Sequence, residues 1–231
     1  MSDTFKIALI GCGKMGLEIE KQAQSLGLEI SQKIDHQHDL ASTTFRPGEV
    51  AIEFTTPESC ISNIEHLLQK NIPIICGTTG WYEQIDDVRH LVEKHGGSFL
   101  YASNFSIGVH LFWQTLDFLS KKINDFPQYD VRAQETHHIY KKDQPSGTAK
   151  TCQHIIEQNI DRITHLPTES FRQGEVFGDH HLFFESAVDC IEINHKAKSR
   201  AGFALGAIAC AQWIADKKGF FNIDHYLQEK Y

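Results

Sequence analysis

The sequence predicts an α/β protein with a doubly wound parallel sheet and a smaller α+β region whose sheet is mainly antiparallel. Three observations predict this. Short β-rich runs alternate with helical periodicity over roughly the first hundred residues. A glycine-rich turn joins the first run to the first helix. After about Ser106 the pattern changes to a long helix followed by longer β-rich segments.

Apolar runs typical of buried strands recur along the first part of the chain. The first of them, Phe-Lys-Ile-Ala-Leu-Ile, is nearly continuous in apolar residues, as expected for a strand covered on both faces. The runs lie at residues 5–10, 28–34, 50–54, 72–76 and 98–102. Because helices separate them, they predict one parallel sheet.

Helical periodicity occurs in three of the four intervals between these runs. Apolar residues recur at the spacing of one helix face from Met15 to Leu26. Thr56 and Pro57 are a favourable N-cap and first-turn pair for a second helix. Residues 85–92 predict a third helix. The strand–helix alternation therefore continues up to the last run, with no helix expected between residues 34 and 50.

The second part of the chain has a different pattern. A long helix is expected at residues 109–123, followed by strand-like segments at 129–135, 170–176 and 180–195. The longer segments favour an antiparallel sheet. An alanine-rich apolar helix at residues 203–215 is expected to be the last helix and must pack against another element.

Composition excludes several classes of protein. The chain has 231 residues, 41% of them hydrophobic, and a formal net charge of −8. An acidic chain without a Lys- or Arg-rich stripe does not favour a nucleic-acid partner. No apolar run approaches the roughly 20 residues of a membrane span, and the run at residues 5–10 leads into glycines, so we expect a strand there and no signal peptide.

The cysteines are widely scattered and none forms a C-x-x-C pair. The six are Cys12, Cys60, Cys76, Cys152, Cys190 and Cys210. This spacing suggests neither a zinc site nor a redox dithiol. We therefore expect free thiols in a reducing cytoplasm and no metal ion.

The turn after the first strand matches G-x-G-x-x-G. Its residues are Gly11, Cys12, Gly13, Lys14, Met15 and Gly16. The first glycine permits a tight bend, the second lets the backbone approach a pyrophosphate, and the third allows close packing of helix on strand. The helix N-terminus that follows offers free N–H groups to phosphates. Its position between a strand and a helix favours a dinucleotide site over a glycine-rich turn without a ligand.

Asp35 follows the second strand, about 20 residues beyond the loop, where a carboxylate accepts hydrogen bonds from a ribose diol. His36 stands where an Arg would signal a 2′-phosphate, and Lys33 is nearby. The residues therefore predict NADH, NADPH or both, and leave the choice between them open.

Ionisable and hydroxyl side chains are concentrated within residues 135–149. His137 and His138 are of the type that titrates near neutral pH, which suits proton transfer and anion binding, and Lys141 adds a positive charge. Pro-Ser-Gly-Thr at residues 145–148 predicts a turn that opens a helix and directs N–H and hydroxyl groups to one place. Each feature alone is typical of a surface residue or a helix cap; their concentration favours a carboxylate or phosphate site.

Residues 135–149 closely resemble the signature E-x-H-x-x-x-K-x-D-x-P-S-G-T-A of the dihydrodipicolinate reductase (4-hydroxy-tetrahydrodipicolinate reductase) family. The resemblance extends across essentially the whole chain, and the central signature is specific where the glycine loop alone is not. Further matching segments lie at residues 11–16, 53–57, 77–80, 103–109, 178–184, 192–200 and 203–207.

This resemblance implies a reaction of the lysine/diaminopimelate pathway. A nicotinamide cofactor would deliver hydride to ring C4 of a cyclic dicarboxylate, 4-hydroxy-tetrahydrodipicolinate, with loss of water. By resemblance His137 is the general acid/base and Lys141 the proton donor. The residues expected to bind the substrate carboxylates are His138, Ser146, Gly147 and Thr148. Those expected around the nicotinamide are Gly77, Thr78, Thr79, Ser103, Asn104, Phe105 and Ser106.

The same resemblance implies a domain arrangement. Residues 1–106 would form a Rossmann-like dinucleotide-binding domain that residues 202–231 complete. Residues 107–201 would form the substrate-binding domain, whose sheet also joins the subunits of a homotetramer.

Two other functions fit part of the sequence. Another small Rossmann dehydrogenase would explain the glycine loop and Asp35, but it would not explain the central signature. A non-catalytic nicotinamide-binding sensor would keep the loop without needing His137 or Lys141. Their presence therefore favours an active reductase.

Overall fold

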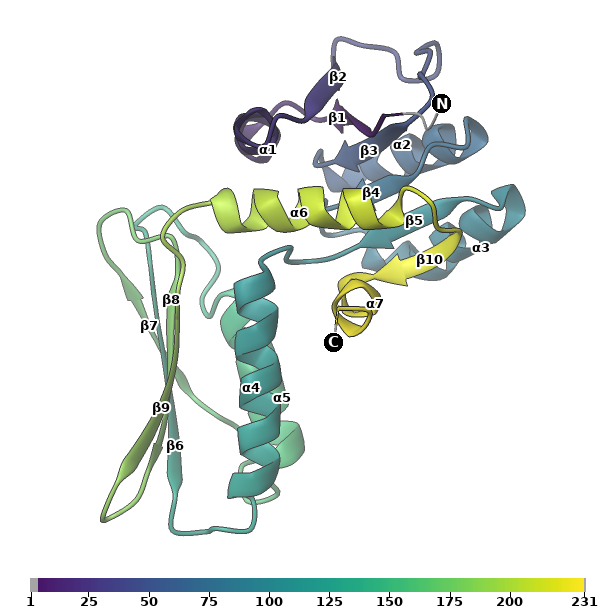
Figure 1. Cartoon of the computed structure of the whole chain (residues 1–231). Helices are drawn as coiled ribbons and strands as arrows, with labels where there is room; N and C mark the ends of the chain where they lie inside the picture. Colours follow the sequence, from purple (N-terminus) through teal and green to yellow (C-terminus); the bar gives the residue numbers. More distant parts are fainter. Residues whose placement is uncertain (1–3, 231) are drawn as a thin grey trace. The chain divides into compact units, whose positions relative to one another are not determined.

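The computed structural model describes residues 4–230, which form two compact units. The first unit contains the chain up to Phe105 together with the stretch from Ala201 onward, and the second contains Ser106–Arg200 (Figure 1). Met1–Asp3 and Tyr231, at the ends of the expected dinucleotide-binding domain, lie outside the described residues.

The first unit is built on a parallel six-stranded sheet in the order β10-β5-β4-β3-β1-β2. Its strands are β1 (Lys6–Ile10), β2 (Glu29–Ile34), β3 (Glu49–Glu53), β4 (Ile74–Cys76), β5 (Ser98–Tyr101) and β10 (Gly219–Asn222). The expected doubly wound parallel sheet is therefore confirmed. The chain reverses its direction of winding between β1 and β3, which is where such sheets bind ligands.

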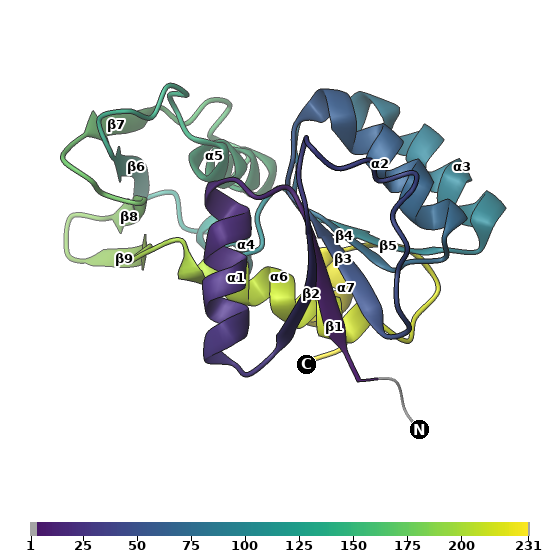
Figure 2. The same cartoon turned by 90° about the horizontal axis from the view of Figure 1, so that it is seen from above.

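Helices cover both faces of this sheet (Figure 2). α1 (Lys14–Ser25) and α6 (Ala201–Ile214) contact each other, and α6 lies against β3, β4 and β5. α2 (Pro57–Gln69) and α3 (Ile85–His95), the latter preceded by the short 3-10 helix η1 (Tyr82–Gln84), pack on the other face. Because helices bury the strands on both sides, β3 is buried along its whole length.

The end of the chain differs from the expectation. The prediction that the helix at residues 203–215 is the last helix is wrong, because β10 and then α7 (Ile223–Gln228) follow it. β10 has four residues and pairs with β5 at the edge of the sheet, and it is too short to show a period in the sequence. α7 begins with a capping box of Asn222 and His225 instead of the usual Ser/Thr and Glu/Gln.

The second unit packs two helices against one face of a four-stranded sheet in the order β7-β6-β8-β9. Its elements are α4 (Ile107–Ile123), β6 (Asp130–His137), α5 (Gly147–Asn159), β7 (Thr168–Arg172), β8 (Asp179–Glu185) and β9 (Cys190–Lys196). The expected mainly antiparallel sheet is confirmed, with β6–β7 as its parallel pair. The expected segment at 180–195 is the β8–β9 hairpin. No helix within residues 4–230 is long and apolar enough to cross a bilayer.

Strand register in this unit brings distant ionisable residues together. Leu182 and Phe184 of β8 are buried in the core beneath α4 and α5, and alternation places His180 on the same face. Glu135 of β6 lies opposite His180, and His137 lies opposite Arg172 of β7. The pairing therefore concentrates acidic and basic groups at the end of β6.

Candidate active site

The glycine loop between β1 and α1 is closely packed at two of its glycines. A Cβ atom on Gly11, whose φ is +96°, would lie 2.0 Å from the carbonyl oxygen of Phe54. A Cβ atom on Gly16 would lie 2.2 Å from the carbonyl oxygen of Gly11. By contrast, a Cβ atom on Gly13 would meet nothing within 4 Å. Gly11 and Gly16 are thus required by packing, and the open side of Gly13 is free for a ligand.

The start of α1 suits an anion. Gly13 is its N-cap and no side chain caps it, so the N–H groups of Lys14, Met15 and Gly16 are not used by a cap. The first turn carries no acidic residue. A helix start with free N–H groups and no negative charge fits a pyrophosphate.

A cavity of about 660 Å³ opens beside this loop, within the first unit. Gly11, Asp35, His36 and Thr55 are among the residues that line it. These residues follow β1, β2 and β3, so the cavity lies at the carboxyl ends of the strands, next to the point where the winding reverses. Its position and size fit part of a dinucleotide.

Asp35 is held in place by its neighbours. Its Oδ1 accepts a hydrogen bond from the Gln37 backbone N–H at 2.9 Å and lies 2.8 Å from Nδ1 of His38. These two contacts lower the pKa of Asp35, so the carboxylate is charged at neutral pH. Lys33 is bound to Glu20 at 3.0 Å, so its ammonium already has an acidic partner.

Cys12, inside the glycine loop, is half-buried. Burial, and then the charge of Asp35, raise the pKa of its thiol. The thiol therefore keeps its proton at neutral pH and is a weak nucleophile.

The loop at residues 77–79 is tied to the loop after β3. The Thr55 N–H donates to Oγ1 of Thr78 at 2.7 Å, which buries the Thr78 side chain. A Cβ atom on Gly77 would lie 2.1 Å from the ring of Phe54, whereas Thr79 is exposed. Of these expected nicotinamide contacts, Thr79 thus offers an accessible side chain and Gly77 its backbone.

The expected segment 103–106 divides between the units. Ser103 is exposed, and Phe105 is buried with its carbonyl oxygen against Gly206 of α6. Ser106 belongs to the second unit, where its Oγ accepts from the Val109 N–H and caps α4. The role of this segment, including Asn104, in holding a cofactor stays a prediction.

Glu135 organises the candidate site of the second unit. It is fully buried, and its two oxygens each lie 3.1 Å from the Ser146 N–H. Arg172 approaches Oε1 at 3.5 Å. Burial opposes ionisation of Glu135, but the contacts with Ser146, Ser170 and His137 together outweigh it and lower the pKa of this carboxyl.

His137 lies beside this carboxylate. Its Nδ1 is 3.5 Å from Oε2 of Glu135 and makes no hydrogen bond of good geometry within the described chain. Burial lowers the pKa of His137; Glu135 opposes this shift, whereas Lys141 and Arg172 add to it. His137 is therefore a neutral imidazole at neutral pH, next to a group that would stabilise its charged form.

Two residues of the β8 region complete the surroundings of His137. The ring of His180 meets that of His137 edge to face, with centroids 5.2 Å apart. Burial and the neighbouring His137 lower the pKa of His180 to about 3. Gly178, with φ of +151°, brings its backbone so close that a Cβ atom there would lie 2.9 Å from Nε2 of His137. The imidazole is thus confined between a neutral ring and bare backbone.

Lys141 stands on the loop after β6. Its Nζ pairs with Oδ1 of Asp143 at 2.7 Å and the side chain is 23% exposed. Arg172 holds this loop, since its guanidinium donates to the carbonyl oxygens of Lys141 and Asp143. Lys141 is thereby a positioned cation near His137.

The remaining predicted substrate residues lie at the start of α5. Ser146 is the N-cap and its Oγ accepts from the Ala149 N–H at 3.2 Å. Gly147 is exposed with open space where a Cβ would be, and Thr148 is half-buried. Nδ1 of His138 is buried without a hydrogen-bond partner in the described chain. The helix start and this imidazole can accept an anion, and their part in substrate binding stays a prediction.

Sequence reasoning did not assign roles to Glu135, Arg172, Gly178 or His180. Glu135 and the Gly178-x-His180 pair lie inside the segments that carry the family resemblance, so the sequence motifs could have identified them as site residues. Arg172 has no such signal. Its position opposite His137 follows only from the parallel pairing of β6 with β7.

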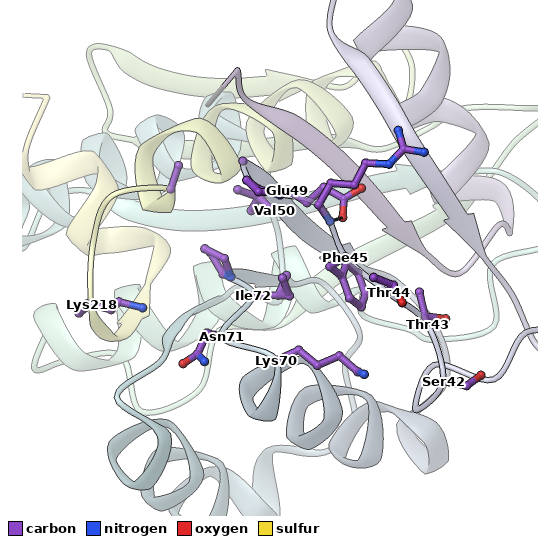
Figure 3. A pocket seen from close by; sticks show the side chains of 15 residues that line it. Ser42, Thr43, Thr44, Phe45, Glu49, Val50, Lys70, Asn71, Ile72 and Lys218 are labelled. Atoms are coloured by element: carbon purple, nitrogen blue, oxygen red, sulfur yellow. Dashed lines mark hydrogen bonds between the residues drawn. The ribbon is translucent and has the colours of Figure 1, made fainter. Parts of the chain in front are cut away.

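A second cavity, of about 590 Å³, lies within the first unit away from all of these residues (Figure 3). It is lined by Phe45, Glu49, Lys70 and Lys218, among others. Glu49 begins β3, so this cavity lies at the amino ends of the strands, opposite to the ligand-binding edge of such sheets. We assign no role to it.

Comparison with known proteins identifies the family. The model described as "Dihydrodipicolinate reductase, N-terminus" matches residues 5–105, and "Dihydrodipicolinate reductase, C-terminus" matches residues 108–227. The 4-hydroxy-tetrahydrodipicolinate reductase of Christiangramia forsetii is 38% identical over 96% of this chain and 98% of its own length. That of Archaeoglobus fulgidus is 31% identical over 96% of this chain and its full length.

A solved structure has the same fold. The dipicolinate-bound dihydrodipicolinate reductase from Paenisporosarcina sp. TG-14 superposes with a TM-score of 0.75 at 22% identity, covering 96% of this chain and 99% of that one. The family models, the relatives and the fold agree with the resemblance of the central segment. This chain belongs to the dihydrodipicolinate reductase (4-hydroxy-tetrahydrodipicolinate reductase) family.

Proposed function

We propose that this chain reduces 4-hydroxy-tetrahydrodipicolinate to tetrahydrodipicolinate with NADH or NADPH, as a step of lysine and diaminopimelate biosynthesis. The observation that carries the proposal is the group at the end of β6. There a buried carboxylate, Glu135, adjoins a neutral imidazole, His137, and the loop that follows places a cation, Lys141, close by.

The first unit would hold the cofactor. The free N–H groups at the start of α1 and the open side of Gly13 suit the pyrophosphate, and Asp35 suits a ribose diol. When bound, the nicotinamide supplies the hydride. Asp35 is charged, and a negative charge there disfavours a 2′-phosphate, whereas His36 and His38 line the same cavity and offer ring N–H groups to a phosphate.

His137 and Lys141 would supply the proton that the reaction requires. Reduction of the ring with loss of water requires one proton at a ring carbon. His137 is neutral in the free protein because it is buried, and a dianionic substrate beside it would raise its pKa, so protonation would accompany substrate binding. Lys141 is the nearby donor that would supply this proton or neutralise a carboxylate.

The substrate carboxylates would bind at the start of α5 and at His138. Gly147 and Thr148 present backbone N–H groups at a helix N-terminus, and His138 presents a buried nitrogen that has no hydrogen-bond partner among residues 4–230. A dicarboxylate needs two such places, which is why the class of substrate follows from this segment. Ser146 would act through the helix cap and through Glu135.

We also propose a cytoplasmic homotetramer. The face of the four-stranded sheet that lies away from α4 and α5 carries the exposed ring of Phe171 and the half-buried ring of Phe183. Apolar side chains on an open sheet face are typical of an oligomer interface. Light scattering after gel filtration would measure the number of subunits.

The decisive test is an assay of NADH and NADPH oxidation, with the substrate generated from pyruvate and aspartate semialdehyde by a synthase. We expect oxidation that requires the synthase and is blocked by pyridine-2,6-dicarboxylate, a planar mimic of the substrate. The ratio of rates with the two cofactors measures what Asp35, His36 and His38 select.

A folded protein that binds NADH yet oxidises neither cofactor would refute the proposal. Fluorescence of the bound cofactor would then separate the alternatives. A sensor or an unrelated dehydrogenase should show no cooperative effect of pyridine-2,6-dicarboxylate on cofactor binding.

A further inference from the structure

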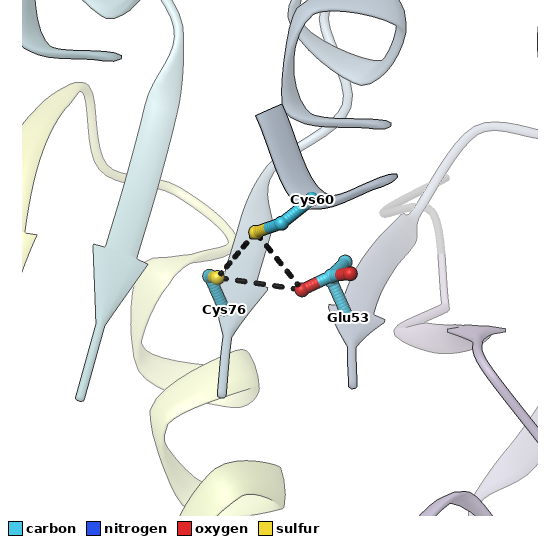
Figure 4. A group of neighbouring side chains, drawn as sticks. All are labelled: Glu53, Cys60 and Cys76. Carbon is cyan, nitrogen blue, oxygen red and sulfur yellow. Dashed lines mark hydrogen bonds between the residues drawn. The ribbon is translucent and has the colours of Figure 1, made fainter. Parts of the chain in front are cut away.

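A carboxylate and two thiols form a fully buried cluster in the first unit (Figure 4). Glu53 ends β3, Cys76 ends β4 and Cys60 lies in α2. Their side chains point toward one another from three different elements. Cys60 and Cys76 are 16 residues apart in the sequence, so no cysteine motif predicted that they lie close together.

The distances within the cluster match those between the ligands of a tetrahedral metal ion. Each thiol sulfur lies close to Oε2 of Glu53, Cys60 at 3.5 Å and Cys76 at 3.4 Å, and the two sulfurs are 3.5 Å apart. In a tetrahedral zinc site two sulfurs lie about 3.8 Å apart, and a sulfur and a carboxylate oxygen about 3.5 Å apart, given the usual bond lengths. Small shifts of the thiols would suffice to place an ion between them.

The charge of Glu53 supports a cation at this place. Among residues 4–230 no Lys, Arg or His forms an ion pair with Glu53, in contrast to Glu135, which has Arg172. The partners of Glu53 are the two thiols and the hydroxyl of Thr55. A fully buried carboxylate without a cationic partner is costly unless it is protonated or coordinates a metal.

The hydroxyl oxygen of a tyrosine lies in the same region of the core and would be a fourth ligand atom. The hydroxyl of Tyr82 is buried and has no hydrogen-bond partner in the described chain. Tyr82 packs against the core cluster that contains Cys60 and Cys76. A phenol oxygen without a partner is a candidate to complete a coordination shell of two sulfurs and one carboxylate oxygen.

We propose that Glu53, Cys60 and Cys76 form a structural binding site for a single thiophilic divalent cation of the zinc type. Two sulfur ligands favour zinc over magnesium or calcium, and a closed, buried site favours a structural role over a catalytic one. Each thiol releases one proton to solvent as it becomes a thiolate ligand, and no electron transfer is involved.

An ion bound at this site would link the carboxyl ends of β3 and β4 to α2. These ends lead directly into the residues that shape the cofactor loops, where the Thr55 N–H binds Oγ1 of Thr78. An ion at this place would therefore stabilise the loop at residues 77–79. The inference does not depend on which substrate the protein reduces, because its readouts are metal binding and thermal stability.

Cobalt(II) provides a direct probe, since thiolate ligands give it a charge-transfer band and tetrahedral geometry intensifies its visible bands. The full chain, reduced and freed of metal with a chelator, would be titrated with cobalt without oxygen. We expect both signatures to saturate at one equivalent, zinc to displace the cobalt, and zinc to raise the midpoint of thermal unfolding.

Variants assign the signal to these residues. Cys60→Ser and Cys76→Ser should remove the charge-transfer band, whereas Cys210→Ser, which changes a buried thiol elsewhere in the same unit, should keep it. If the cysteine variants do not fold, Glu53→Gln decides, with an expected loss of cobalt affinity of at least about 10-fold.

Three results would overturn the inference. The reduced wild type, with all six thiols titratable after unfolding, could give no charge-transfer band, which would leave a metal-free hydrogen-bonded cluster of two thiols and Glu53. The band could persist in both cysteine variants. Mass spectrometry of protein purified without reductant could find Cys60 linked to Cys76, which would make the pair a disulfide.

Discussion

The two units form their candidate ligand sites from different chemical groups. In the first unit, the loop from Gly11 to Gly16 offers backbone N–H groups and the space left by absent side chains. In the second unit, Glu135, His137 and His180 are buried ionisable side chains; Glu135 and His137 shift each other's pKa, and both shift that of His180. The first site is therefore sensitive to added volume, and the second to charge and pH.

The largest expected effect comes from removing the central imidazole of the second unit. His137→Ala should lower kcat by about 10²-fold or more, the usual contribution of a positioned acid or base. The buried Glu135 then loses its neighbour but keeps the Ser146 N–H and Arg172, so the fold should persist. Steady-state kinetics with generated substrate measures the loss.

Lys141→Ala is the companion variant. It should lower kcat and raise KM together, because a cation near a dicarboxylate contributes to binding as well as to proton transfer. An unchanged KM would place Lys141 away from the substrate carboxylates. Near-normal turnover of His137→Ala would remove the acid role of that residue and leave Lys141 to carry it.

In the first unit, cofactor binding and stability should respond to side-chain volume added at the glycine loop. Gly13→Ala places a methyl group in the open space beside the loop, so it should weaken binding of NADH and NADPH by roughly 10-fold and leave the thermal midpoint unchanged. Gly16→Ala should lower the thermal midpoint, because its Cβ would lie 2.2 Å from a carbonyl oxygen. Fluorescence titration and thermal melts separate the two effects. Equal cofactor affinity in Gly13→Ala would mean that the pyrophosphate does not pass this glycine.

The same contrast explains how much the sequence could predict. The glycine loop is local: its turn, its N-terminal N–H groups and its close packing involve residues a few positions apart, so the motif and the flanking strand and helix predicted it. The parallel sheet and the mainly antiparallel sheet were also predictable from strand–helix order. β10 was not, because a four-residue edge strand has too few residues to show a pattern.

The surroundings of His137 depend on strand register instead. Arg172 reaches the site because β7 pairs in parallel with β6, and His180 because β8 pairs antiparallel on the other side. A shift of one residue would turn either side chain to the opposite face. The meeting of Cys60 and Cys76 likewise requires α2 to pack over the end of β4, which no local spacing encodes.

Removing charge without removing shape should have a moderate effect in the second unit. Glu135→Gln keeps the side chain that faces the Ser146 N–H but removes the charge that raises the pKa of His137. The pKa of His137 should fall further, so the limb of the kcat/KM profile that reports its protonation should move to lower pH, with a loss of turnover of roughly 10-fold.

Asp117→Asn is a matched control for that variant. Asp117 is a carboxylate on α4 of the same unit, paired with Lys121 at an exposed position. It should leave the pH profile in place. If Glu135→Gln also left the profile in place, the limb would belong to a group other than His137.

The smallest effect concerns stability, and it follows from His180. Its pKa is lowered from 6.5 in the unfolded chain to about 3 in the folded protein. Between these values the unfolded state binds the proton and the folded state does not, so stability is complete above about pH 6.5 and falls as the pH is lowered toward 3. From pH 7 to pH 5, protonation of this histidine in the unfolded state should lower the free energy of unfolding by roughly 2 kcal/mol.

His180→Gln, which cannot titrate, should be less stable than the wild type at pH 7 and should lose less stability on acidification. Urea unfolding at the two pH values measures the difference, and equal losses in both proteins would show that His180 is protonated or hydrated in the fold. The glycine loop of the first unit has no buried histidine and should contribute nothing to this acid sensitivity.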